Sequence, residues 1–242
     1  MAERTALVVG NAGDDDPGYV GDRLLERGFR LHAVLREAGQ LSHAFPAESP
    51  PDLVLLLGSD WSVHAHVDAA ALEAECDLVR RAADASVPVL AICYGAQVAA
   101  HALGGTVSAA PGPEVGVVHV DTCDAKLVPK GPWTAFHTDE LEPPPGATVV
   151  ARNDCGTQAF TLPGLLGVQF HPEVRPDVLD DWSRRFPELL RVARVNRDEL
   201  VSRARADEDR SRAAAYALVD AFLLREAAGR AAGPEESQSG VT

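Results

Sequence analysis

Short apolar runs alternate with longer segments of helical periodicity over the first part of the chain. The runs are bounded by glycine, proline or polar residues and fall at residues 6–9, 31–35, 53–57 and 87–92. Such runs are typical of strands that are buried on both faces. Between the last two, apolar residues recur at spacings of three and four over residues 68–85, which predicts an amphipathic helix. The alternation predicts a doubly wound α/β fold, with helices on both faces of a mostly parallel sheet.

The pattern changes between residues 106 and 168, where short β-rich pieces are separated by proline and glycine turns. We expect these pieces at residues 115–120, 126–128, 148–151, 157–162 and 165–170. Short runs with turn residues between them are typical of antiparallel strands. A meander or an antiparallel sheet edge is therefore expected in this part of the chain.

The chain becomes helical in pattern after Pro172. Apolar residues recur at helical spacing up to residue 228, with Asn196 and Asp209 as candidate N-caps. The last stretch, residues 229–242, is small and polar, which predicts a disordered tail. The expected organisation is an α/β domain over residues 1–175, a C-terminal helical extension over residues 176–228 packed on it, and the tail.

Charge separates the same two regions. The chain of 242 residues has 22 Lys and Arg against 36 Asp and Glu, a net charge of −14, which argues against nucleic acid as a partner. Residues 1–173 hold 23 acidic and 10 basic side chains, whereas residues 174–232 hold 11 acidic and 12 basic ones. The arginine-rich helices are thus the place where we expect a partner protein or a homodimer contact.

Neither a membrane span, a leader nor a metal site is indicated. No apolar stretch reaches the roughly 18 residues that a spanning helix needs, and the N-terminus lacks the residue order of a signal peptide. The four cysteines form no Cys-x-x-Cys pair. His64 and His66 alternate without a third ligand nearby, so no metal and no cofactor is expected. We expect a cytoplasmic protein without a zinc knuckle or a disulfide framework.

The strongest chemical signal surrounds Cys93. An apolar strand runs directly into this cysteine, Gly95 follows, and a helical run starts at Gln97. This order is typical of a nucleophile elbow with cysteine in the serine position. The N-terminus of the following helix would favour the thiolate form. The alternative is that Cys93 is only a small buried apolar residue.

A base and its partner are found at the end of a later strand. His171 ends an apolar run, Pro172 stops the strand, and the carboxylate of Glu173 follows. A carboxylate there can orient the imidazole and stabilise its charged form. The hypothesis is that Cys93 is the nucleophile, His171 the base and Glu173 the group that orients it. A plain surface turn is the alternative for the His-Pro-Glu triplet.

Four segments together resemble one family. Residues 91–97 resemble the G-x-C-x-G-x-Q elbow of the class I glutamine amidotransferases, and residues 167–173 resemble their G-x-Q-F-H-P-E strand end. Residues 55–63 are similar to the family's strand and G-G-P-x-S-V loop, and residues 135–139 to its S-H-x-D segment. Within the family the chain most resembles the glutaminase domains of GMP synthetases, with residues 114–116 similar to a Glu-Val-Gly strand start in that branch.

The resemblance implies a flavodoxin-like glutaminase fold and hydrolysis of the side-chain amide of L-glutamine to glutamate and ammonia. Cys93 would form a γ-glutamyl thioester, and His171 with Glu173 would complete a catalytic triad. The backbone N–H groups that the resemblance assigns to the oxyanion hole belong to Gly58, Ser59 and Tyr94. The residues that it implies as substrate contacts are Gln97, Phe136, His137 and Gln169.

Some positions depart from the family's pattern. Ala91 replaces the first glycine of the elbow, Ser59 and Asp60 replace a Gly-Pro pair, and Phe136 stands where serine is common. None of these changes removes a triad member. The loss of glycine and proline alters the geometry of the oxyanion loop, and Phe136 is expected to narrow the end of the pocket that holds the amino acid.

The sequence contains neither a G-x-x-x-x-G-K-[ST] phosphate loop nor the S-G-G-x-D-S adenylating loop of GMP synthetases. We therefore expect any ammonia-accepting synthetase to be a separate protein. Two alternatives stay open: a free-standing hydrolase of another γ-glutamyl amide, and a non-catalytic regulatory or binding relative. Related peptidases and chaperones commonly carry histidine directly after the cysteine, and Tyr94 at that position argues against them.

Overall fold

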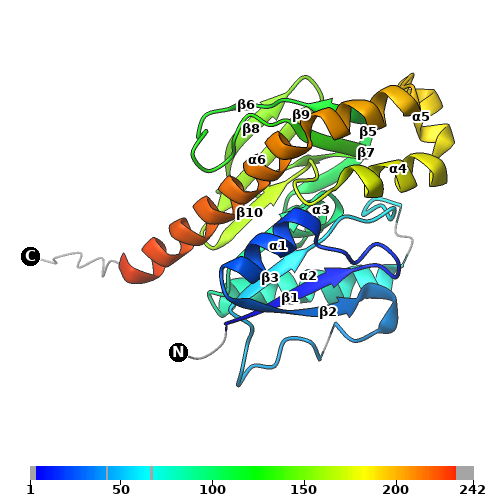
Figure 1. Ribbon diagram of the computed structural model, residues 1–242. Helices are drawn as coiled ribbons and strands as arrows, with labels where there is room; N and C mark the ends of the chain where they lie inside the picture. Colours follow the sequence, from blue (N-terminus) through cyan, green and yellow to red (C-terminus); the bar gives the residue numbers. More distant parts are fainter. Residues whose placement is uncertain (1–3, 42, 66–67, 233–242) are drawn as a thin grey trace, which may run out of the picture.

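An eight-stranded sheet forms the centre of the protein in the computed structural model, which describes residues 4–41, 43–65 and 68–232 (Figure 1). The strand order is β2-β1-β3-β4-β10-β9-β8-β6, in which the first five strands are mutually parallel and the last three continue antiparallel. The expected doubly wound fold with an antiparallel edge is confirmed. The strands are, in sheet order, β2 (Phe29–Leu35), β1 (Arg4–Gly10), β3 (Leu53–Leu56), β4 (Val89–Ile92), β10 (Leu165–Val168), β9 (Gly156–Leu162), β8 (Thr148–Asn153) and β6 (Asp121–Thr122).

Helices cover both faces of this sheet because successive residues of each central strand point to opposite sides. In β1, Val8 belongs to the same hydrophobic cluster as Leu218, whereas Val9 belongs to a second cluster with Val79. Figure 1 shows the first face covered by the N-terminal helix and by the long C-terminal helix. The helices are α1 (Gly18–Glu26) and α6 (Arg197–Ala232) on that face, and α2 (Ala69–Asp84) and α3 (Tyr94–Ala102) on the other.

Two further strands, β5 (Thr106–Val118) and β7 (Trp133–Glu142), pair antiparallel as a separate small sheet. The apolar pattern does not predict β7, because polar residues interrupt it. The prediction of a strand at residues 126–128 is wrong. The carboxylate of Asp124 accepts the backbone N–H groups of Lys126 and Leu127, both at 3.2 Å, and so holds a turn there.

The C-terminal region is helical as expected, with α4 (Pro176–Arg185) and α5 (Pro187–Ala193) ahead of α6. Asn196 precedes α6 and its side chain accepts the N–H of Glu199 at 3.1 Å, as an N-cap does. Asp209 does not cap a helix: it lies inside α6, paired with Arg212 one turn on at 2.6 Å.

The last helix continues to Ala232, past residue 229, where the tail is expected to begin. Residues 233–242, the rest of the expected disordered tail, lie outside the described residues. In the part of the chain that the structure describes, no helix is both long enough and apolar enough to cross a membrane.

Candidate active site

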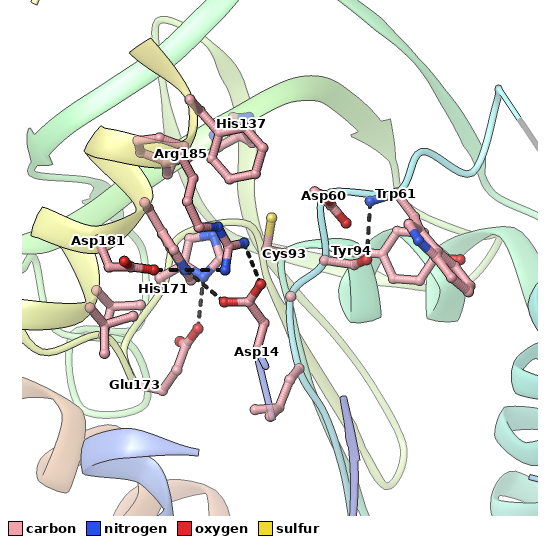
Figure 2. Close-up of a pocket in the computed structure, with 18 of the residues that line it drawn as sticks. Asp14, Asp60, Trp61, Cys93, Tyr94, His137, His171, Glu173, Asp181 and Arg185 are labelled. Carbon is pink, nitrogen blue, oxygen red and sulfur yellow. Dashed lines mark hydrogen bonds and ion pairs between the residues drawn. The ribbon is translucent and has the colours of Figure 1, made fainter. Parts of the chain in front are cut away.

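Cys93 lies in a sharp turn between β4 and α3, at the carboxyl ends of the parallel strands. Its backbone angles are φ 50° and ψ −110°, a conformation that is costly for a residue with a side chain and is typical of functional sites. Its N–H donates to the carbonyl of Val168 at 2.8 Å, and its carbonyl accepts the N–H of Gln97 at 3.0 Å. The side chain lines a cavity of about 500 Å³, into which the sulfur projects in Figure 2.

His171 and Glu173 follow β10 and line the same cavity. The Nδ1 atom of His171 lies 2.7 Å from the Oε1 atom of Glu173, so the ring donates from Nδ1 to the carboxylate (Figure 2). The His171 backbone N–H donates to the carbonyl of Thr134 on β7 at 2.8 Å, which ties this segment to the small sheet. The buried Nε2 atom has no hydrogen-bond partner among the described residues, so it is left for a reacting group.

The start of α1 supports Glu173 from behind. The backbone N–H of Tyr19 donates to the carbonyl of Glu173 at 3.0 Å. A Cβ on Gly18 would lie only 1.9 Å from that carbonyl oxygen, and the φ of Gly18 is +48°. Only glycine accommodates both the left-handed backbone and this close approach. The first helix therefore fixes the segment that carries the carboxylate.

The charge state of His171 is set by two opposing effects. Burial of the ring lowers its pKa, but the negative charges of Cys93 and Glu173 outweigh burial and hold the pKa of His171 well above its usual value. The rings of His171 and Trp182 also pack in a T-shaped arrangement, with 4.9 Å between the ring centres. The site thus favours an imidazolium, which can protonate a leaving group.

Three backbone N–H groups are free to bind an anion beside Cys93. Gly58 and Ser59 follow β3, Tyr94 begins α3, and all three residues line the cavity. Among the described residues, their N–H groups donate to no protein acceptor. A Cβ on Gly58 would lie 2.7 Å from the His171 Cε1 atom and 3.6 Å from the Cβ of Cys93, so this loop lies directly against both side chains.

The loop that follows Gly58 is held by a side chain in place of the family's proline. The hydroxyl of Ser59 accepts the N–H of Trp61 at 3.0 Å, which closes a short turn (Figure 2). The rings of Trp61 and Tyr94 pack in a T-shaped arrangement, with 6.4 Å between the ring centres. The departures of this loop from the family pattern are therefore compatible with an ordered turn at the cavity.

Two glutamines form a buried pair beneath the nucleophile. The side-chain N–H of Gln97 donates to the carbonyl of Gln169 at 3.3 Å, and the Gln169 amide donates in turn to the Cys93 Sγ at 3.6 Å. Gln97 lines the cavity, whereas Gln169 lies behind the cysteine. Among the residues assigned from the sequence, Gln169 alone does not line the cavity wall, and it contacts the sulfur instead.

His137 is among the residues that line the cavity, but both of its ring nitrogens have protein partners. Nε2 lies 2.8 Å from the carboxylate of Glu114, and Nδ1 lies 3.0 Å from the carbonyl of Asp139. Glu114 also accepts from Asn153 at 2.5 Å and from Gln158 at 3.0 Å. Burial raises the pKa of Glu114, and the hydrogen bonds outweigh it and lower that pKa overall. The ring nitrogens of His137 thus connect β7 to Glu114 of β5 beside the cavity.

The C-terminal helices form the opposite wall of the cavity. Phe136 of β7 packs against Trp182 and Phe186, at 5.6 Å and 6.1 Å between ring centres. The Nε1–H of Trp182 donates to the carboxylate of Asp14 at 2.9 Å (Figure 2). The residues of this wall are Asp177, Val178, Asp181, Trp182, Arg185, Phe186 and Leu189. The sequence motifs do not reach them, and helical periodicity alone does not show which face meets the active site.

The acidic residues near the cavity are largely engaged in protein contacts. Asp14 and Asp181 both pair with Arg185, and Asp16 accepts the N–H of Gly18 at 2.9 Å. Asp14 and Asp16 therefore help to hold the segment ahead of α1 in place. Within residues 4–41, 43–65 and 68–232, no three His, Cys, Asp or Glu side chains are grouped so that they could hold a metal. His66 lies outside these ranges.

A family model described as glutamine amidotransferase class-I matches residues 20–182. A GMP synthase (glutamine-hydrolyzing) of Aeropyrum pernix is 35% identical over 172 residues, which cover 61% of this chain and 32% of that protein. A GMP synthase (glutamine-hydrolyzing) subunit from Saccharolobus solfataricus is 37% identical over 98 residues, covering 37% of this chain and 52% of that one. The chain thus spans about a third to a half of the length of these curated relatives.

Solved structures share the fold over almost the whole chain. A glutamine amidotransferase from Thermotoga maritima superposes with a TM-score of 0.79 at 22% identity, covering 92% of this chain and 99% of the other. A glutamine amido transferase from Methylobacillus flagellatus gives 0.78 at 20% identity, covering 93% and 95%. At these identities the likeness establishes the fold, and the C-terminal helices are included in it.

Proposed function

Because the chain belongs to the class I glutamine amidotransferase family, we propose that it hydrolyses the side-chain amide of L-glutamine through a thioester on Cys93. The observation that carries the proposal is one arrangement around the cavity. A cysteine in a strained elbow, a His171–Glu173 pair and three unpartnered backbone N–H groups all line the same wall. These are the nucleophile, the base with its orienting group, and the anion site that acyl transfer requires.

In the first half of the reaction, the Cys93 thiolate attacks the carboxamide carbon and forms a C–S bond. The negative charge that develops on the carbonyl oxygen is bound by the N–H groups of Gly58, Ser59 and Tyr94. One such donor is worth roughly 10²–10³ in rate. The imidazolium of His171 gives its proton to the amide nitrogen, the C–N bond breaks, and ammonia leaves the γ-glutamyl thioester.

In the second half, water replaces ammonia. The now neutral His171 takes a proton from the water, whose oxygen attacks the thioester carbon and regenerates the oxyanion. Collapse of this intermediate breaks the C–S bond and releases glutamate and the Cys93 thiolate. Glu173 accepts from Nδ1 throughout, so Nε2 is always the atom that gives or takes the proton. The Gln169 amide donates to the sulfur from behind at 3.6 Å.

We propose that a separate protein receives the ammonia. Two curated relatives are named as single subunits of GMP synthase (glutamine-hydrolyzing), and the chain covers 52% and 53% of them. A synthetase that docks at the cavity mouth would take up ammonia before it is lost to water. All four cysteines are free thiols, which suits a reducing compartment, and the cytoplasm is the proposed location.

A second candidate is a hydrolase of a larger γ-glutamyl amide, which uses the same nucleophile with a different leaving group. The size of the cavity favours it: about 500 Å³ lies in the range that accommodates drug-sized ligands, which is more than one amino acid needs. The aromatic wall from α4 and α5 provides an apolar surface for the rest of such a molecule.

The decisive experiment is an assay of the purified protein against glutamine and a panel of γ-glutamyl amides, with ammonia and amine measured separately. Ammonia from glutamine that disappears in C93A supports the glutaminase. Amine release at much higher kcat/KM than ammonia release supports the second candidate. Turnover of neither class, with and without a candidate synthetase, contradicts both proposals and favours a non-catalytic relative.

A further inference from the structure

Arg36 is a completely buried arginine behind the oxyanion loop. It opens the short 3₁₀ helix η1 (Arg36–Ala38), which follows β2 at the carboxyl ends of the parallel strands, and it is 1% exposed. A buried charge is costly unless it is paired and hydrogen-bonded. The partners of this guanidinium therefore indicate what the arginine is there to hold.

One side of the guanidinium is neutralised by Glu75 of α2. The Nε atom donates to Oε2 at 2.8 Å and Nη2 donates to Oε1 at 3.1 Å, and neither side chain is exposed to solvent. Nη1 also donates to the side-chain carbonyl of Asn11, just after β1, at 2.7 Å. Such a bidentate pair fixes the orientation of the planar guanidinium as well as its charge.

The remaining N–H groups reach the oxyanion loop. Nη2 donates to the carbonyl of Leu57 at 2.7 Å, and Nη1 donates to the carbonyl of Gly58 at 3.2 Å. In a planar trans peptide the N–H points opposite to the C=O. Fixing these two carbonyls on Arg36 therefore directs the N–H groups of Gly58 and Ser59 away from the guanidinium.

Arg36 also contacts the residue that carries the third donor. Its guanidinium carbon lies 5.0 Å from the centre of the Tyr94 ring, a cation–π contact in a buried setting. Tyr94 directly follows Cys93 and begins α3, so its own N–H is the one beside the sulfur. A single side chain thus holds the two separate segments that supply the donors.

We propose that Arg36, fixed by Glu75 and Asn11, is a positioning residue that orients the backbone donors of the oxyanion hole. It does not touch the substrate, and its effect passes through the peptide groups that it holds. The inference rests on the proposed hydrolysis at Cys93, because it assigns a role within that reaction. It adds to that reaction a polar support that the sequence motifs do not include.

The test compares variants that fold but differ in this support. Removing Arg36 alone leaves the Glu75 charge buried without a partner, which destabilises the fold. The double variant R36M/E75M removes both charges, and replacing a buried ion pair by apolar residues of similar volume is often tolerated. The matched control is R81M: Arg81 donates to the carbonyls of Phe45 and Leu41 and lies over the Phe45 ring, away from the cavity.

The expected result is a loss in kcat with little change in KM. The oxyanion is absent from the ground-state complex and develops in the transition states that lead to and from the tetrahedral intermediate, so weakened donors lower kcat while ground-state binding persists. In R36M/E75M we expect kcat to fall by about 10²–10³, the effect of losing one donor, while R81M keeps the wild-type kcat. R36K keeps the charge but cannot reach all these acceptors, so its kcat is expected to lie between those of R36M/E75M and R81M.

A second readout separates positioning from a general loss of structure. Iodoacetamide alkylates Cys93 when the thiolate forms a C–S bond and iodide leaves, and this displacement creates no oxyanion. The alkylation rate of the Cys93 peptide, followed by mass spectrometry, should therefore be unchanged in R36M/E75M. An unchanged kcat, or a fall in kcat matched by an equal fall in alkylation, would overturn the positioning role. Wild-type protein that turns over no γ-glutamyl amide would instead overturn the proposed function, and this role with it.

Discussion

The two walls of the cavity differ in how they are built. The sheet wall consists of strand ends and tight loops, where Cys93, His171 and the backbone donors lie within a few ångströms of one another. The facing wall consists of α4, α5 and the residue between them, and it contributes large side chains such as Trp182 of α4 and Phe186 at the junction. We therefore expect the sheet wall to perform the chemistry and the helical wall to select the substrate.

The largest expected effect lies on the sheet wall. C93A should reduce ammonia release from glutamine to background, a loss on the order of 10⁶ in kcat as for other removed nucleophiles. Steady-state ammonia release measures it, with C123A as the matched control because Cys123 is an exposed thiol away from the cavity. Equal activity in C93A and C123A would remove Cys93 from the mechanism.

E173Q should lower kcat by up to about 10²–10⁴, the usual contribution of a general acid or base, because His171 loses the carboxylate that orients it for this role. Glu173 helps to raise the pKa of His171, so without it that pKa falls and the imidazolium is lost at lower pH. The alkaline limb of the kcat profile should therefore move to lower pH. The raised pKa of His171 also contributes to the free energy of unfolding. This contribution is fully present below the pKa of histidine in the unfolded chain, about 6.5, and is lost as pH rises through the pKa of His171 in the folded protein. An unshifted alkaline limb would separate Glu173 from His171.

G58A should reduce kcat by about 10², the loss that a misplacement of about 1 Å can cause. The new Cβ would lie 2.7 Å from the His171 Cε1 atom, so the loop and the imidazole must move apart. G112A is the matched control, since no atom lies within 4 Å of a Cβ there and Gly112 is not in the left-handed region. Full activity in G58A would contradict the close approach of the oxyanion loop to His171.

The helical wall should show a smaller effect of a different kind. W182A opens the cavity beside Phe136, so the ratio of kcat/KM for a bulky γ-glutamyl amide to that for glutamine should rise about tenfold, the low end of what pocket contacts contribute. The turnover number for glutamine should change far less than in G58A. If W182A lowers kcat equally for every substrate and leaves the ratio of kcat/KM values unchanged, the helical wall does not select the substrate.

Much of the fold could be predicted because its determinants are local. The apolar runs correspond to the central strands, and Asp68 caps α2 by accepting the N–H of Ala71 at 3.0 Å. The two wrong predictions of secondary structure also have local causes. The side chain of Asp124 makes a turn where a strand is expected, and Arg212 stabilises the helix across Asp209, where a boundary is expected.

The residues of the candidate site also differ in whether local sequence or tertiary structure determines their place. Cys93, His171 and Glu173 stand out because rare residue types follow strand ends in a recognisable order, and the fold places them on one cavity. Arg36 could not be identified from the sequence, because nothing distinguishes an arginine that follows a strand from an exposed one. Only the fold shows that it forms a buried ion pair with Glu75 of another element. Trp182 could not be identified either, because its partner Phe136 lies on β7, far away in the sequence. Such contacts are set by tertiary structure and leave no local pattern.

The most direct test of the central claim is mass spectrometry of the protein after rapid acid quench during glutamine turnover. We expect a γ-glutamyl adduct on the peptide that carries Cys93, which builds up before steady state and is released by hydroxylamine as a thioester is. The adduct should be absent from C93A and present in C123A. Sustained glutamine turnover with Cys93 unmodified, or an adduct on another cysteine, would contradict hydrolysis through a thioester on Cys93.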